Sequence, residues 1–190
     1  MELIVVTPPD YFEGEGILIN QFFAEGLDLL HIRKPKSDAA QFRKLMIEIK
    51  PEYYPAISIH QHHELADEFS LKRLHYTELH RKSVKTAELD GLRGRGFCLS
   101  SSIHELGALK ETAKLHFFDY VFFGPVFDSI SKAGYQSILE PDFILPPHPV
   151  KVFAIGGVRT DRLRQLKRMN FDGAAVLGSL WHQPHTPLTV

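Results

Sequence analysis

Short apolar runs recur along the chain, and the segments between most of them are long enough for one helix. Eight such runs stand at Leu3–Val6, Leu27–Ile32, Ala56–Ile59, Arg73–Tyr76, Phe97–Ser100, Tyr120–Phe123, Val152–Ile155 and Gly173–Leu177. Their length and apolar content are typical of strands buried on both faces in a parallel sheet. Eight strands with helices between them predict an α/β fold, a single (β/α)8 barrel. We expect one domain over residues 1–190.

The predicted helices have recognisable starts. Ser37 or Asp38 can cap a helix over Ala39–Ile49. Four apolar residues there share one face at helical spacing and predict core: Phe42, Leu45, Met46 and Ile49. Ser102 with Glu105 has the spacing of a capping box and predicts a helix over Ile103–Leu115.

Two connections depart from the regular alternation. The segment Tyr135–Pro149 holds Pro141, Pro146, Pro147 and Pro149, which predicts an irregular link between the sixth and seventh strands. After the eighth strand only a short, proline-containing segment remains. The last helix is therefore expected to be missing or trimmed, and an uncovered strand favours a partner subunit such as a second copy.

Composition narrows the function classes. The 190 residues are 44% hydrophobic and carry a formal net charge of −1, so we expect small-molecule partners rather than nucleic acid. No apolar run approaches the roughly 20 residues of a membrane span, and the N-terminus lacks a basic leader, so the expected compartment is the cytoplasm. The single cysteine, Cys98, lies in an apolar run and is interpreted as a buried structural thiol.

Small residues end the last two strands. Gly156 and Gly157 follow one apolar run, and Gly178 with Ser179 follows the next. In (β/α)8 barrels the loops after strands 7 and 8 commonly bind phosphate through backbone N–H groups. We therefore expect Gly157, Gly178 and Ser179 to form a phosphate cradle.

Other strand ends carry candidate site residues. Alternation directs His31 and Arg33 to one side of the second strand, toward the barrel interior or its mouth. Arg33 is then placed to bind a phosphate or, alternatively, to form a structural salt bridge. Ser100 can hold a polar ligand or cap a helix. Lys132, in a loop too long for a plain turn, can close over a phosphate or stay solvated.

Histidines raise the question of a metal site. His60, His62 and His63 stand together after the third strand, but such close neighbours cannot all converge on one ion. We assign no metal ligand among these residues. His75 and His80 are interpreted as packed or solvated side chains.

Taken together, these motifs resemble the family of thiamine phosphate synthases and TenI-type thiazole tautomerases. The resemblance rests on His31-Ile32-Arg33, on Asp119–Phe127 with Ser129–Lys132, and on Ala154–Val158 with Gly173–Val176. It implies a phosphorylated thiazole bound at the C-terminal barrel face, with its phosphate at Gly157, Gly178 and Ser179. Arg33 matches the arginine of the synthase strand-2 motif, and Ser100 matches the strand-5 serine. Ser129, Ser131 and Lys132 match the Thr-x-Thr-Lys loop of the synthases.

Departures from the synthase pattern affect the expected mechanism. His31 replaces the motif glutamine, while His60-Gln61 and His80 stand where synthases carry their Mg²⁺ carboxylates. The family therefore implies Mg²⁺ only if synthase activity is retained. The tautomerase branch shares the His-Ile-Arg version of strand 2, although its general-base histidine falls on Pro125 here.

Three functions remain open. We expect a TenI-like enzyme of thiamine biosynthesis that acts on a phosphorylated thiazole, with His31, Arg33 and Lys132 as its catalytic residues. His31 would act as acid and base. An active synthase that joins a pyrimidine pyrophosphate to the thiazole phosphate is the first alternative. A non-catalytic binder of a thiamine intermediate is the second.

Overall fold

The computed structural model describes all residues except 111–115, 129–136, 138, 141, 178–180 and 182–190. Eight parallel strands close into a barrel in the order in which they occur along the chain. They are β1 (Glu2–Val6), β2 (Leu30–Ile32), β3 (Ile57–Ile59), β4 (Arg73–Tyr76), β5 (Cys98–Ile103), β6 (Tyr120–Phe123), β7 (Lys151–Ile155) and β8 (Gly173–Val176). β1 pairs with both β2 and β8, which closes the ring. The predicted (β/α)8 barrel is confirmed, and each of the eight apolar runs overlaps its strand, although β5 continues three residues beyond the predicted run.

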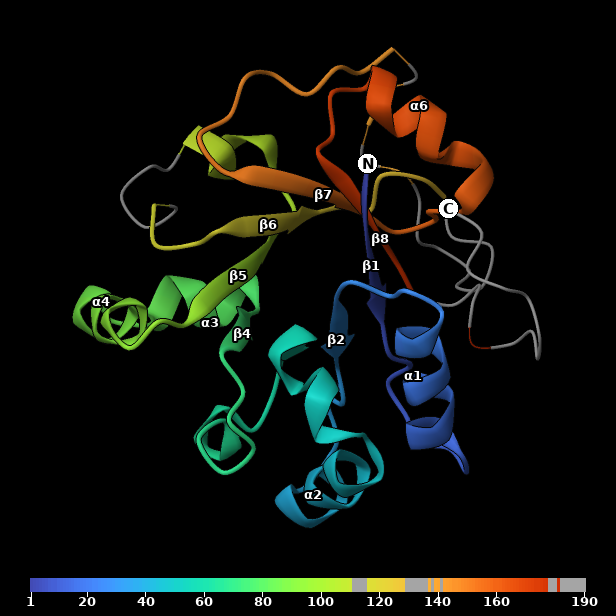
Figure 1. Cartoon of the computed structure of the whole chain (residues 1–190). Coiled ribbons are helices and arrows are strands. Elements are labelled where there is room, and N and C mark those ends of the chain that lie inside the picture. The colour runs from blue at the N-terminus through green and yellow to red at the C-terminus, as the bar shows by residue number, and fades with distance from the viewer. Residues whose placement is uncertain (111–115, 129–136, 138, 141, 178–180, 182–190) are drawn as a thin grey trace.

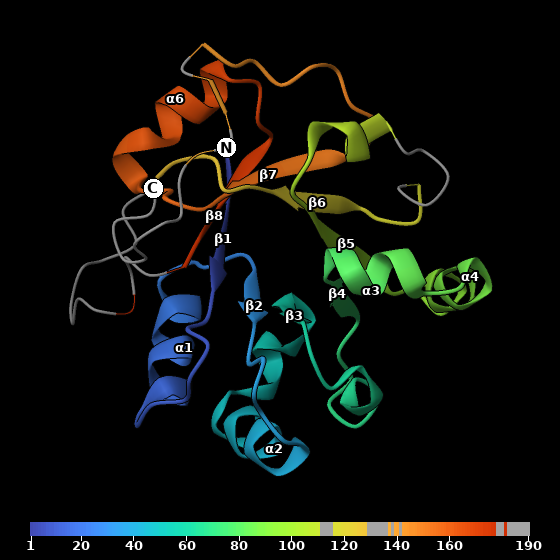
Figure 2. The same ribbon diagram turned by 180° about the vertical axis from the view of Figure 1, so that it is seen from behind.

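Helices surround this ring of strands (Figure 1; Figure 2 shows the opposite side). They are α1 (Glu15–Ala24), α2 (Ala39–Glu48), α3 (Glu78–Ser83), α4 (Thr86–Gly94) and α6 (Leu163–Arg168). Short 3₁₀ helices occupy Pro51–Ala56, His63–Leu65, Leu106–Lys110 and Thr160–Arg162. Among the described residues, the longest and most apolar helix is still too short and polar to cross a membrane.

Helix α2 forms as its sequence predicts. Asp38, rather than Ser37, is the N-cap, and its carboxylate accepts a hydrogen bond from the backbone N–H of Gln41. The Gln41 side chain in turn accepts from the Asp38 backbone, which completes a capping box. The predicted core stripe on this helix is buried.

The capping box predicted at Ser102 is wrong. β5 continues through Ile103, so Ser102 lies in the strand, and only a 3₁₀ helix at Leu106–Lys110 follows in the described part of the chain. The Ser102 hydroxyl bonds a histidine ring instead of a helix terminus. Serine and glutamate three residues apart also fit a strand end, which is why the motif misled.

The two irregular connections have different outcomes. The described residues between β6 and β7 contain no helix, and their trace passes irregularly outside these strands (Figure 1). This agrees with the four prolines of that segment. The expected missing or trimmed last helix falls on residues 182–190, which lie outside the described residues.

Side chains pack in two separate layers on the two faces of the barrel wall. The larger cluster joins outward strand residues such as Val5 and Ile57 to helix residues such as Phe42 and Leu166. The smaller cluster contains Ile4, Val6, Tyr120, Phe122, Phe153 and Ala175, alternate positions of β1, β6, β7 and β8. Since alternate strand residues point to opposite faces, this second cluster fills the barrel interior.

Candidate functional site

Polar side chains line the opposite side of the barrel interior, on β2 to β5. The register places His31 beside Ser58 and His75 beside Ser100 across neighbouring strands. His60 directly follows β3. All five side chains are at least nine-tenths buried, so they form a polar region enclosed within the fold.

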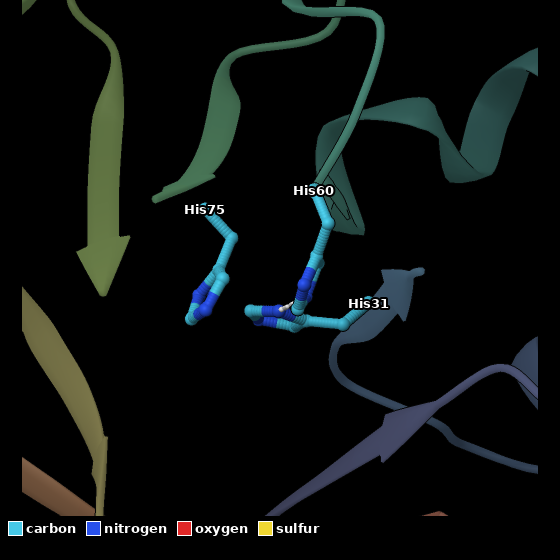
Figure 3. A group of neighbouring side chains, drawn as sticks. All are labelled: His31, His60 and His75. Carbon is cyan, nitrogen blue, oxygen red and sulfur yellow. Dashed lines mark hydrogen bonds between the residues drawn. The ribbon is translucent and has the colours of Figure 1, made fainter. Parts of the chain in front are cut away.

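Three of these residues bring their imidazole rings together (Figure 3). Nδ1 of His31 and Nε2 of His60 share a hydrogen bond of 2.9 Å. Nε2 of His31 bonds the Tyr120 hydroxyl at 2.7 Å. The rings of His60 and His75 stack, with centroids 4.0 Å apart. We call His31, His60 and His75 the imidazole cluster.

Serine hydroxyls hold the third ring. Nδ1 of His75 bonds Ser100 Oγ and its Nε2 bonds Ser102 Oγ, both at 2.9 Å. Ser100 is almost wholly buried beneath the C-terminal face of the barrel. The structure therefore pairs Ser100 with His75, and its expected contact with a polar ligand stays a prediction.

Burial keeps the imidazole cluster neutral. Desolvation is the main cause that lowers the pKa of each ring, to about 3 for His75 and well below the ordinary value for His31 and His60. Neighbouring positive charges lower these pKa values further, with Arg73 acting on His31 and Arg33 acting on His60 and His75. Each ring thus has one N–H donor and one acceptor nitrogen at neutral pH.

His31 points inward, as alternation predicts. It is 0% exposed, however, so it lies inside the barrel rather than at its open mouth. Both of its ring nitrogens already have protein partners. Of the three rings in the cluster, His60 is the most exposed, at 8%.

Arg33 lies one strand position beyond Ile32, where β2 ends. Its backbone N–H donates to Thr7 Oγ1 at 2.9 Å, which ties the end of β2 to the end of β1. The side chain is partly exposed. No ion pair links Arg33 to a carboxylate among the described residues, so the structural salt bridge finds no partner there.

The glycines after β7 are required by the chain itself. Gly156 and Gly157 have φ angles of +90° and +62°. A Cβ on Gly157 would lie 2.6 Å from the Phe127 carbonyl oxygen and 2.5 Å from that of Asp128. The close approach is thus made by the loop after β6, which the Phe127 N–H also fastens to Gly156 O at 3.1 Å. Phosphate binding at Gly157 stays a prediction.

Several predicted site residues lie outside the described residues. They are Ser129, Ser131 and Lys132 in the loop after β6, with Gly178 and Ser179 after β8. The described neighbours do bring the start of that loop against Gly157, as the adjacent strand order requires.

The histidine run after β3 does not converge on one point. His62 bonds Ser37 Oγ at 3.0 Å, whereas His63 bonds the Ile59 carbonyl at 3.2 Å. His80 is exposed on α3, where it packs against Tyr76 and His63. The expectation that these neighbours would not share one ion agrees with this arrangement.

Sequence reasoning missed a buried ion pair beside the barrel mouth. Lys34 Nζ lies 2.7 Å from Glu15 Oε1, and both side chains are 1% exposed. Nζ also donates to the carbonyls of Pro8 and Asp10, at 3.0 and 2.9 Å. Lys34 therefore fixes the loop after β1 against β2. A lysine just past a strand and a glutamate at a helix start were the available signals.

Two further features are the Cys98 thiol and an open groove. Burial raises the pKa of Cys98 to about 11, so its thiol stays protonated and unreactive at neutral pH. An open groove of about 410 Å³ lies beyond β4 and β5, lined by Thr77, Glu78, Leu79, Lys82 and His104.

Comparisons with known proteins place this geometry in a family. A family model described as thiamine monophosphate synthase matches residues 3–180. A thiamine phosphate pyrophosphorylase from Bacteroides thetaiotaomicron has a similar structure, with a TM-score of 0.71 and 30% sequence identity over 99% of this chain and 88% of that one. A thiamine phosphate pyrophosphorylase from Pyrococcus furiosus shares the fold, with a TM-score of 0.66 and 17% identity over 93% of this chain and 85% of that chain.

Curated relatives match over shorter segments. Thiamine-phosphate synthase 1 of Streptococcus pneumoniae (strain ATCC BAA-255 / R6) is 30% identical over 86 residues, which span 42% of this chain and 40% of that protein. The thiamine-phosphate synthase of Salinibacter ruber is 38% identical over 65 residues, 33% of this chain and 29% of its own length. The matched segments thus span less than half of these relatives. The family match, in contrast, extends over nearly the whole chain, which therefore belongs to the thiamine monophosphate synthase family.

Proposed function

We propose that this protein binds a phosphorylated thiazole at the C-terminal face of its barrel. Family membership supports this ligand class. The single observation that carries the proposal is Arg33, a partly exposed cation at the end of β2 without an ion-pair partner among the described residues. A guanidinium in this position can bind a phosphate in bidentate geometry. The phosphate would lie between Arg33 and the glycines after β7 and β8.

The chemistry we propose is proton transfer of the TenI type rather than Mg²⁺-assisted synthesis. The synthase motif puts oxygen ligands after strands 3 and 4, where this chain has His60, Gln61 and His80. Mg²⁺ prefers oxygen ligands in an octahedral arrangement, and imidazoles fit it poorly. The Gln61 side-chain oxygen is also occupied, since it accepts a 2.7 Å hydrogen bond from the Lys34 backbone N–H. The residues after β3 and β4 therefore do not fit a Mg²⁺ site.

His31 stays the proposed acid and base, but its burial requires a relay. A proton exchanged with a ligand at the mouth would pass through His60, whose Nε2 lies 2.9 Å from His31 Nδ1. When one ring gains a proton on one nitrogen, it can donate the proton of its other nitrogen onward. His60 is thus the residue that meets the ligand, and His31 with Tyr120 sets its protonation state.

A direct binding assay tests the proposal. Trp181 is the single tryptophan, and its indole N–H donates to the Val6 carbonyl at the C-terminal end of β1. Its fluorescence should change as thiazole phosphate is added. Arg33→Gln should weaken that binding by more than about tenfold, because a charged hydrogen-bond partner is lost. Arg43→Gln is the matched control, since Arg43 pairs with Glu68 on the surface of α2. Equal affinity in the two variants would contradict the proposal.

Turnover assays separate the alternatives. His31→Asn should abolish thiazole tautomerisation and spare thiazole-phosphate binding. Formation of thiamine phosphate from the pyrimidine pyrophosphate, thiazole phosphate and Mg²⁺ would instead establish a synthase. Binding without either reaction would identify a carrier or sensor of a thiamine intermediate.

A further inference from the structure

We propose that His31, His60 and His75 form a binding site for one divalent transition-metal ion of the Zn²⁺ type inside the barrel. One nitrogen from each ring lies within 4.8 Å of the others. The rings come from three consecutive strands, with His31 on β2, His60 directly after β3 and His75 on β4 (Figure 3). The site uses the His31–His60 pair of the proton relay proposed above, so a bound ion would block that relay. The proposal does not depend on the proposed ligand and is tested with the metal alone.

The rings have the chemistry that such an ion requires. Neutral imidazole nitrogen is a preferred ligand of Zn²⁺ and of neighbouring metals, and three histidines form a known zinc ligand set. Burial already holds these rings in the neutral form, so no proton has to be removed to create ligands.

Their other contacts resemble the outer contacts of a metal site. A metal-bound histidine usually bonds a further protein group through its second nitrogen, which fixes the orientation of the ring. Nε2 of His31 has such a partner in Tyr120, at 2.7 Å. His75 has two such partners, Ser100 and Ser102. One ring nitrogen can therefore exchange its serine for the ion while the other nitrogen keeps its hydrogen bond.

The ion would replace the proton that His31 and His60 now share. Their facing nitrogens are now 2.9 Å apart. Two ligands that each lie about 2.0–2.1 Å from one tetrahedral ion are about 3.3 Å apart, so the two rings would turn toward the ion and separate by a few tenths of an ångström. His31 would then carry its proton on Nε2 and donate it to the Tyr120 oxygen. His60 would carry its proton on Nδ1. Each ring stays neutral, so binding needs a change of tautomer and no net release of protons.

Charge sets a further condition on this site. The neighbouring titratable groups that act on the cluster are Arg33, Arg73 and His63. The two arginines are positive, and His63 is neutral at pH 7 because burial lowers its pKa to about 4. A divalent cation beside two guanidinium groups is stabilised by an anion at the remaining coordination position. His60, the most exposed ring, marks the side from which that anion would enter. Metal affinity should therefore rise when a small coordinating monoanion such as azide is present.

Metal titration of the purified, metal-free protein tests the site. Calorimetry with Zn²⁺, and visible absorption with Co²⁺ as a spectroscopic substitute, should show one ion per chain in a tetrahedral environment. His75→Gln and His60→Gln should each weaken binding by more than about tenfold. His62→Gln is the control, because His62 lies outside the cluster and bonds Ser37 and Glu64 at the surface.

Two results would overturn the proposal. One is the absence of stoichiometric binding by the wild-type protein, with or without azide. The other is binding that His62→Gln removes and His75→Gln preserves, which would place the ion on the surface histidines. If the cluster variants fail to fold, the wild-type chain still decides the question. With ¹⁵N-labelled histidine, Zn²⁺ should shift three imidazole signals together, and shifts confined to other histidines would count against the site.

Discussion

The two halves of the barrel interior are filled by different kinds of side chain. On β6, β7, β8 and β1 the space is filled by apolar side chains such as Phe122, Phe153 and Ile4. On β2 to β5 it is filled by imidazoles and hydroxyls, and the three histidine rings bond one another or the hydroxyls of Ser100 and Ser102. Phe122 lies at the boundary, with its ring centroid 4.7 Å from that of His31 and 5.0 Å from that of His75.

The two halves of the interior should differ in how their stability depends on pH. An apolar half depends on shape and area alone, so its stability should vary little with pH. A half built of neutral imidazoles depends on their protonation state, because a buried charged ring without a counterion is costly. The same substitutions and conditions should therefore affect the two halves unequally.

Acidification should have the largest effect. The cluster pKa values are lowered in the folded state, so the unfolded chain binds more protons below its histidine pKa of about 6.5, and stability falls as pH falls from there. Each group contributes about 1.4 kcal/mol per pH unit, which gives a loss of about 6 kcal/mol for three rings by about pH 5. His63, with a pKa of about 4, adds to this loss. Urea unfolding of metal-free protein at neutral pH and near pH 5 measures it, and equal unfolding free energies at the two pH values would contradict it.

Truncation in the apolar half should cost nearly as much and be independent of pH. Phe153 is 2% exposed and packs against Tyr120. Phe153→Ala should lower the free energy of unfolding by about 3–5 kcal/mol through lost burial and the cavity left behind. The same difference from wild type should be found at neutral pH and at about pH 6 in urea unfolding. A difference that grows on acidification would mean that the two halves are coupled.

Substitution of the buried lysine tests how much a buried ion pair outside the barrel interior contributes to stability. Lys34→Met leaves the Glu15 carboxylate buried without its cation, which should cost about 3 kcal/mol. The double variant Lys34→Met with Glu15→Leu should recover part of that loss, because no unpaired charge remains. Thermal unfolding of both variants measures the difference, and a double variant less stable than the single one would refute this explanation.

Loss of the tyrosine hydroxyl should give the smallest effect. Tyr120→Phe removes the 2.7 Å partner of His31 Nε2 and keeps the aromatic ring. The unpaired nitrogen should cost about 1–2 kcal/mol of stability. Tyr53→Phe is the control, because Tyr53 lies in the outer layer, where its ring stacks on Phe23. Urea unfolding compares the two, and an imidazole NMR spectrum should show altered tautomers for His31 only in the first variant.

The sequence predicted the strands better than the site, for a physical reason. Each strand is a local apolar run, so β1 to β8 could be predicted one at a time. The imidazole cluster depends instead on the stagger between strands, which puts His31 beside Ser58 and His75 beside Ser100. Alternation predicted the inward direction of His31, but His75 was interpreted as a packed or solvated side chain. Inward positions of four consecutive strands, examined together, carry the signal that could have found the cluster.

The contacts of the glycines after β7 also depend on tertiary structure. The pattern at Gly156 and Gly157 predicts a backbone that comes close to a bound phosphate, and that contact stays a prediction. The partner that approaches is the loop after β6, through the Phe127 and Asp128 carbonyls. A glycine pattern indicates that another group lies close to the backbone. Which group it is depends on the tertiary structure.

The measurement that tests this account most directly is the protonation of the cluster in the folded, metal-free protein. Histidine ¹⁵N NMR should be followed from neutral pH to about pH 5.5, with the three rings assigned by single substitutions. The account predicts that His31, His60 and His75 stay neutral and keep fixed tautomers throughout this range. Titration of any of the three near pH 6.5 in the folded chain would contradict it.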